Sequence, residues 1–157
     1  MKKNKITIIL SVILLILIIF IILLTISIKN KSAFKKPEFD KNAIENISSE
    51  LDYQSKIIKV TDNYSLYIEP EPIINDNYLI INLISLETND IWLKVRVLKE
   101  NEVVAETGLI KPGQYLEKVQ LKKKLDSNDE IVYMVMGYEK DSYLSAGTIK
   151  LNTRIGE

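Results

Sequence analysis

The stretch that decides the fold is Ile91–Leu98, IWLKVRVL, in which aliphatic residues recur at every second position. In a β-strand, successive side chains point to opposite faces of the sheet. One face of this stretch would carry only aliphatic residues: Ile91, Leu93, Val95 and Val97. The other face would mix charged and apolar residues: Trp92, Lys94, Arg96 and Leu98. The stretch therefore predicts a strand with one buried face and one partly exposed face.

Similar stretches lie on both sides of it. Ile131–Tyr138 is apolar on both faces, which is typical of a central strand that is covered on both sides. Lys111-Pro112-Gly113-Gln114 has the Pro and Gly that a type II turn favours, and Lys99–Glu102 is a polar break suited to a hairpin. The predicted strands are Lys56–Val60, Tyr64–Ile68, Tyr78–Leu86, Ile91–Lys99, Val103–Gly108, Tyr115–Leu121, Glu130–Tyr138 and Leu144–Asn152.

This spacing predicts a mainly β chain with an Ig-like antiparallel β-sandwich over residues 56–157. Short strands that recur about every 8–12 residues, without a long helical period, are typical of a sandwich. An immunoglobulin-like domain has roughly 100 residues, close to the length of this region. Because the chain has no Cys, it lacks the disulfide of antibody domains, and the prediction concerns architecture alone.

An unbroken apolar run, residues 6–28, precedes this domain and contains no charged residue, Gly or Pro. As an α-helix it would be about 34 Å long, against about 30 Å for the hydrocarbon core of a bilayer. The alternative is a cleaved signal peptide, whose apolar region has about 7–15 residues and ends at small residues. Here Lys29-Asn30-Lys31 follows the run. We predict a transmembrane helix over residues 6–28 in the lipid bilayer, after a cytoplasmic tail of residues 1–5.

The lysines on the two sides of the run leave its orientation almost balanced. Three precede it and four follow it: Lys2, Lys3, Lys5, Lys29, Lys31, Lys35 and Lys36. A short N-terminal tail is the usual layout of a signal anchor, and long domains cross the membrane largely regardless of charge. We expect a single-pass protein of the cell membrane with an extracytoplasmic C-terminal domain. The opposite orientation would leave this domain in the cytoplasm.

Residues 29–55 form a predicted juxtamembrane stalk. Polar residues dominate it, and Pro37 stops the anchor helix from continuing. Four apolar residues recur at a spacing of four: Phe39, Ala43, Ile47 and Leu51. A short amphipathic helix is therefore one alternative, and a flexible spacer is the other. Both would hold the domain away from the membrane.

Charge is distributed unevenly along the chain. Residues 1–36 hold seven of the 21 basic residues and no acidic residue, so residues 37–157 hold 14 basic and 21 acidic residues, a net charge of −7. An acidic region is poorly suited to binding nucleic acid, because affinity for nucleic acid depends largely on neutralising its phosphates. The chain also has no Cys and no His, which removes thiol nucleophiles, histidine bases, Ser-His-Asp triads and most zinc sites. The sequence predicts no enzyme, no cofactor, and no catalytic or metal-binding residues.

Three segments carry a resemblance to known proteins. They are KPEFDKNA at Lys36–Ala43, NDIWLKVRVLKENEVVAETGLIKPGQYLEKVQL at Asn89–Leu121, and VYMVMGYEKDSYLSAGTIKLNT at Val132–Thr153. Together with the anchor, they resemble small single-pass membrane proteins of Gram-positive, Firmicutes-type bacteria. The resemblance implies a membrane-tethered β-sandwich outside the cell. It implies no activity and no site residues.

Two charged clusters are candidate binding groups. The first contains three carboxylates on an extended chain, Glu69-Pro70-Glu71-Pro72 with Asp76, which could bind Ca²⁺. Such Pro-rich segments are more often exposed connections between strands. Lys122-Lys123-Lys124 would suit teichoic acid or lipid headgroups. Such a lysine run is more often a solvated loop, or a charged segment that prevents strand pairing between two sheet edges.

Aromatic residues are the third candidate. The chain has one Trp and eight Tyr: Trp92, Tyr53, Tyr64, Tyr67, Tyr78, Tyr115, Tyr133, Tyr138 and Tyr143. Surface Tyr with Trp92 would suit contact with a sugar or a protein, but half of these tyrosines fall on predicted core faces, where Tyr is common. The leading hypothesis is that the β domain binds a protein partner, for example as an accessory subunit of an envelope, secretion or conjugation complex. The alternative is a cell-wall or carbohydrate-binding module.

Overall fold

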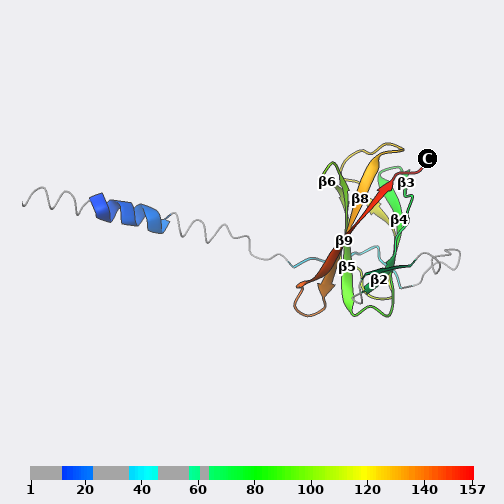
Figure 1. The fold of residues 1–157 in the computed structure, drawn as a ribbon, viewed down its shortest axis with the longest axis horizontal. Helices are drawn as coiled ribbons and strands as arrows, with labels where there is room; N and C mark the ends of the chain where they lie inside the picture. Colours follow the sequence, from blue (N-terminus) through cyan, green and yellow to red (C-terminus); the bar gives the residue numbers. More distant parts are fainter. Residues whose placement is uncertain (1–11, 23–35, 46–56, 61–63) are drawn as a thin grey trace, which may run out of the picture. The chain divides into compact units, whose positions relative to one another are not determined.

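The computed structural model describes residues 12–22, 36–45, 57–60 and 64–157 (Figure 1). The chain divides into two compact units, Met1–Lys36 and Pro37–Glu157. In the first unit, residues 12–22 form an α-helix. The other parts of the predicted transmembrane helix, residues 6–11 and 23–28, lie outside the described residues. Among the residues that are described, no helix has the length and apolar character needed to cross a membrane.

The second unit is mainly β, as predicted. Its described residues form nine strands: β1 (Ile58–Val60), β2 (Tyr64–Tyr67), β3 (Ile73–Asn75), β4 (Tyr78–Ser85), β5 (Ile91–Lys99), β6 (Glu102–Glu106), β7 (Tyr115–Gln120), β8 (Glu130–Glu139) and β9 (Ser145–Arg154). All eight predicted strands are present, with bounds that differ by a few residues. Alternation of burial, which is clearest along β5 and β9, explains much of this agreement, because the sequence pattern and the sheet have the same period.

The strands form two antiparallel sheets. One has the order β1-β2-β4-β3, with β7 also paired to β4, and the other has the order β6-β5-β8-β9. Figure 1 shows β5, β8 and β9 running beside one another in the second sheet. One cluster of buried side chains draws on both sheets, for example Leu66 and Leu83 from the first and Val95 and Ile131 from the second. The two sheets therefore share a core.

Strands β5 and β8 show why the sheet faces differ. Along β5, buried residues alternate with half-buried ones from Ile91 to Val97, as the sequence predicts. Strand β8 lies between β5 and β9, the central position that its two apolar faces predict. Its side chains toward the core are almost fully buried, whereas Val132 and Met134 on the other face are half-buried. The outer face of this sheet is therefore partly apolar.

The predicted turns also form. Glu100 and Asn101, between β5 and β6, have φ of 52° and 67°, the left-handed pair that a two-residue type I′ hairpin needs. Gly113 has φ of 77°, as the third position of a type II turn requires. The Gln114 N–H donates to the Lys111 carbonyl at 3.1 Å, which closes that turn.

Strand β3 was not predicted. It has three residues, follows Pro72, and pairs with β4 across a turn at Asp76, where φ is 53°. A strand of three residues is too short to show an alternation of apolar and polar residues. The acidic and Pro-rich residues before it therefore suggested a connection between strands. The pairing partner on β4, and not a local pattern, makes this segment a strand.

Residues 37–45, which the sequence placed in the stalk, are part of the β unit. The Asp40 N–H donates to the Leu109 carbonyl at 2.9 Å, the Leu109 N–H donates to the Glu38 carbonyl at 2.8 Å, and Ile44 exchanges two backbone hydrogen bonds with Tyr115. Phe39 and Ala43 are therefore not helical, because their segment bonds to distant strands. The other positions of the possible helix, Ile47 and Leu51, lie outside the described residues.

Gly108 permits this close approach. A Cβ atom at Gly108 would lie 2.4 Å from the Asp40 backbone nitrogen and 2.7 Å from the Phe39 carbonyl carbon. Both atoms belong to the backbone, so no side-chain rotation would relieve the contact. The Gly108 N–H also donates to the Asp40 carboxylate at 2.8 Å. A residue without a side chain thus holds the segment 37–45 against the domain.

Candidate interaction surfaces

Three aromatic rings meet at the end of the β unit where the chain enters it. We call Phe39, Trp92 and Tyr143 the aromatic cluster. The Phe39 and Trp92 centroids are 4.9 Å apart with planes at 81°, and the Trp92 and Tyr143 centroids are also 4.9 Å apart, at 59°. Both arrangements fall within the range of favourable aromatic pairs. The three rings come from the segment 37–45, from β5 and from the β8–β9 turn.

Cationic and apolar side chains surround the aromatic cluster. The Lys111 Nζ lies 4.8 Å from the centroid of the Phe39 ring, within cation–π distance. Leu144, next to Tyr143, is 63% exposed. Lys140 forms an ion pair of 2.7 Å with Asp90. This end of the domain therefore combines aromatic rings, an exposed Leu, lysines and exposed acidic residues such as Asp90 and Asp141.

The structure brings together part of the predicted aromatic patch. Trp92 contacts Tyr143 and lies opposite Tyr138 on β8, whereas four other tyrosines are buried: Tyr64, Tyr67, Tyr115 and Tyr133. Tyr78 contacts Lys118 elsewhere on the first sheet, and Tyr53 lies outside the described residues. The sequence did not identify Phe39, because it had been placed in the stalk. Trp92, half-buried, therefore has the Phe39 and Tyr143 rings as neighbours.

Each lysine of the basic triplet has an acidic partner. Lys122 meets Glu106 at 3.0 Å, Lys123 meets Glu102, and Lys124 meets Asp126 at 3.5 Å. Much of the positive charge is therefore matched within the domain. This arrangement gives less support to binding of a polyanion here than the sequence alone suggested.

Glu106 is the centre of the strongest charge cluster. Its carboxylate accepts from Arg96 at 2.7 Å, and lies 2.9 Å from the Lys94 Nζ and 3.0 Å from the Lys122 Nζ. Burial raises the pKa of Glu106, but hydrogen bonds from Arg96, Lys94 and Lys122 outweigh it and lower the pKa to about 2. One carboxylate thus joins β5, β6 and the segment after β7.

The acidic cluster of the sequence does not converge. The Glu69 carboxylate accepts from the Tyr67 hydroxyl at 2.9 Å and lies 3.5 Å from the Asn82 amide. Glu71 instead lines a pocket beside the second sheet, and Asp76 is in the β3–β4 turn. In the part of the chain that the structure describes, no three acidic residues gather as a metal ion would need.

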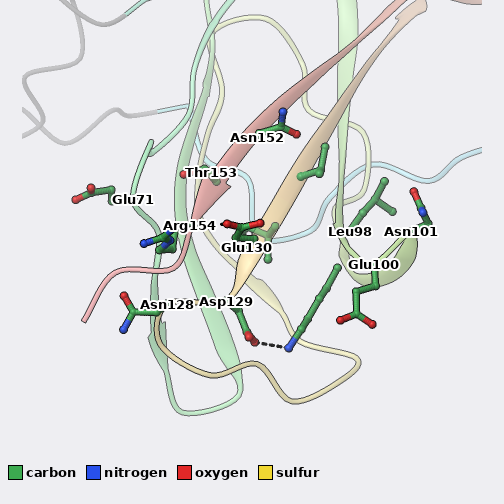
Figure 2. Close-up of a pocket in the computed structure, with 13 residues that line it drawn as sticks. Glu71, Leu98, Glu100, Asn101, Asn128, Asp129, Glu130, Asn152, Thr153 and Arg154 are labelled. Atoms are coloured by element: carbon green, nitrogen blue, oxygen red, sulfur yellow. Dashed lines mark hydrogen bonds and ion pairs between the residues drawn. The ribbon is translucent and has the colours of Figure 1, made fainter.

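That pocket lies at the far end of β5, β8 and β9 and has a volume of about 970 Å³. Its charged residues are four acids and two bases: Glu71, Glu100, Asp129, Glu130, Lys99 and Arg154. Figure 2 shows Arg154 beside Glu130. Lys99 forms an ion pair of 2.7 Å with Asp129. A hydrogen bond from the backbone N–H of Asp126 and one from the Lys99 side chain lower the pKa of Asp129. The pocket is polar, acidic and open.

Strand β9 forms an edge of the second sheet. Among the described strands it pairs with β8 alone. Near its C-terminal end, Thr153 donates to the Pro70 carbonyl and the Gly156 N–H donates to the Pro72 carbonyl at 2.9 Å. These contacts cover the last residues of the edge, and the described part of the chain supplies no backbone partner for residues 145–152 on that side.

The direction of the β9 backbone groups follows from one hydrogen bond. The Ile155 N–H donates to the Asp129 carbonyl at 3.0 Å, toward β8. The direction alternates along an antiparallel strand, and the register between β8 and β9 is continuous from Arg154 back to Thr148. The N–H groups of Thr148, Lys150 and Asn152 therefore point toward the open side.

No protein family, curated protein or solved structure matches this chain. Two features of the β unit are candidate sites of interaction. They are the open edge of β9 and the aromatic cluster.

Proposed function

We propose that this protein is a single-pass protein of the cell membrane whose extracytoplasmic, Ig-like β-sandwich binds a protein partner along the open edge of β9. It would act as a non-enzymatic binding subunit, for example as an accessory subunit of an envelope, secretion or conjugation complex. The resemblance to single-pass membrane proteins of Gram-positive bacteria is consistent with this proposal.

The apolar run of residues 6–28 supports the anchor. It has the length that a helix needs to span a bilayer, and its described middle, residues 12–22, is helical. The short N-terminal tail favours an extracytoplasmic C-terminal domain. Two antiparallel sheets around a shared core support a sandwich of the immunoglobulin type.

The open edge of β9 is the observation that carries the binding proposal. A long unpaired strand presents N–H and C=O groups to which another strand can bond. Natural proteins commonly protect such edges with Pro, a bulge or repeated charges. The register shift between β8 and β9 lies before Thr148, and residues 148–152 contain no Pro and a single charged residue, Lys150, so this part of the edge is little protected.

The side chains of β9 indicate the kind of strand that would bind. Ile149 and Leu151 pack against the core but remain partly exposed at the edge. An added strand with alternating apolar residues would cover them. On the other face Lys150 is exposed and would favour an acidic neighbour, whereas antiparallel pairing of two copies around this position would bring two lysines together. The favoured partner is a different protein that presents an extended, acidic and apolar segment.

Photo-cross-linking in intact cells tests this proposal. The full-length protein would carry a photoreactive residue at Thr148 on the open edge or, as a control, at Glu117 on β7, which is also exposed. We expect an adduct of defined mass from position 148 and none from position 117. An adduct of twice the mass of the chain would show that two copies pair with each other and would contradict a distinct partner.

A matched pair of variants separates backbone pairing from other contacts. Lys150→Pro removes the outward N–H without removing a hydrogen bond to β8, whereas Lys150→Ala keeps that N–H. Edge strands tolerate Pro at such positions. We expect Lys150→Pro to abolish the adduct and Lys150→Ala to keep most of it. An adduct that persists in a folded Lys150→Pro protein, or the absence of any adduct at Thr148, would contradict the proposal.

A further inference from the structure

The aromatic cluster lies close to the membrane if the anchor is where we propose. Phe39 is two residues after Pro37, the start of the β unit. Eight residues, 29–36, separate the end of the predicted transmembrane helix from Pro37. Fully extended, this connection spans at most roughly 30 Å. The end of the domain that carries the aromatic cluster is thus tethered near the bilayer surface.

The side chains at this end match the chemistry of the membrane interface. Trp and Tyr prefer the headgroup region, where an amphipathic ring has both apolar and polar surroundings. Trp92 and Tyr143 are half-buried, and Leu144 is 63% exposed beside them. Lys41 and Lys111 are exposed on the neighbouring segments, and basic residues near the surface attract anionic lipids.

The cluster is also held in place before any contact with lipid. Phe39 belongs to a segment that hydrogen-bonds to Leu109 on both sides of it. Tyr143 has φ of 58°, and its N–H donates to the Glu139 carbonyl at 3.0 Å, which fixes the turn that presents Leu144. Such rigidity lowers the entropic cost of binding.

We propose that the aromatic end of the β domain rests on the anionic surface of the membrane, with Leu144 and the rim of the Trp92 ring at headgroup depth. This inference rests on the proposed membrane anchor.

The same arrangement determines the direction of the partner-binding edge, because β9 begins beside the aromatic end and ends at the acidic pocket. With about 3.3 Å per residue, its edge would extend away from the membrane and carry the pocket of Figure 2 at the distal end.

Trp92 is itself the probe for this arrangement, because it is the only Trp in the chain. The full-length protein would be reconstituted into vesicles of phosphatidylcholine and phosphatidylglycerol, with or without bromine on the acyl chains near the headgroups. Bromine quenches Trp fluorescence at short range. We expect Trp92 to lose fluorescence in the brominated vesicles, and to lose less at high salt or without phosphatidylglycerol.

Two variants of equal chemistry serve as test and control. Leu144→Asp places a charge at the proposed membrane contact, whereas Ile73→Asp places one on β3, at a residue that is 44% exposed. We expect Leu144→Asp to abolish the quenching and Ile73→Asp to retain it. Circular dichroism would confirm that both variants are folded.

Flotation of the vesicles distinguishes the possible failures. If the protein floats with the vesicles but Trp92 is equally bright in both, the anchor holds and the docking of the aromatic end is wrong. If the protein does not float, the proposed anchor is wrong and the docking falls with it. If isolated cell-wall fragments change the Trp92 fluorescence and brominated lipid does not, the cluster is a carbohydrate site and the docking is contradicted.

Discussion

A single carboxylate, that of Glu106, holds three cationic side chains on the outer face of the second sheet. Its pKa is lowered to about 2 because Arg96, Lys94 and Lys122 together outweigh its burial. A carboxyl group whose pKa is lower in the folded protein stabilises the fold above its unfolded pKa, about 4.3. That stabilisation is lost as the pH falls from there toward 2. Glu106 thus links the stability of this face to pH.

Substitution of Glu106 tests this link. We expect Glu106→Gln to lower the free energy of unfolding by on the order of 2 kcal/mol near neutral pH, because the Lys94 side chain, only 15% exposed, loses its partner. The difference from the native protein should shrink below about pH 4. Urea unfolding of both proteins across this pH range measures it. A difference that does not change with pH would contradict the assignment, and Glu102→Gln, at an exposed pair, provides the control.

Gly108 is the second residue whose role can be tested by one substitution. We expect Gly108→Ala to displace the segment 37–45, because the new Cβ would lie 2.4 Å from the Asp40 nitrogen, and to cost about 1–3 kcal/mol, as overpacking does. If Phe39 moved away from Trp92, the fluorescence emission of Trp92 would shift to longer wavelength. Gly156→Ala, whose new Cβ would meet no atom closer than the Ile73 Cγ2 at 3.3 Å, is the control. An unchanged emission for Gly108→Ala would show that the segment is not held there.

At the scale of single elements, the sequence predicted the strands whose pattern is local and missed those whose partners are remote. β5 and β8 follow from alternation within their own residues. β3 has three residues, and the segment 37–45 pairs with Leu109 and Tyr115, which are far away in the chain. No local pattern reports such pairing. The edge position of β9 likewise depends on the order of strands in the sheet.

The candidate sites differ in the same way. Trp92 stood out in the sequence because it is unique, and the structure places Tyr143 beside it. Phe39 and Lys111 carried no signal of their own, since the cluster forms only when three separate elements meet. The basic triplet was visible in the sequence, but the structure places Glu106 and Glu102 opposite two of its lysines. The acidic cluster was also visible, but Glu69 bonds to Tyr67 whereas Glu71 lines the pocket.

At the scale of the whole molecule, we propose a β domain that is tethered to a membrane and has a strand edge open to a partner. In this proposal, the anchor would limit how far the aromatic end can move from the bilayer, and the length of β9 would determine how far the binding edge extends from it. The lipid contact requires the anchor, and an envelope partner also requires the domain to be on the outer side of the cell membrane.

Labelling of intact cells tests directly whether the β domain lies on the outer side of the cell membrane. The chain has no native Cys, so single substitutions Asn4→Cys and Ser127→Cys can be treated with a maleimide that does not cross membranes. Asn4 is in the predicted cytoplasmic tail, and Ser127 is exposed in the turn before β8. The account predicts that Ser127→Cys is labelled on intact cells and that Asn4→Cys is labelled only after the cells are broken. Labelling of Asn4→Cys alone on intact cells would place the β domain in the cytoplasm and contradict the account.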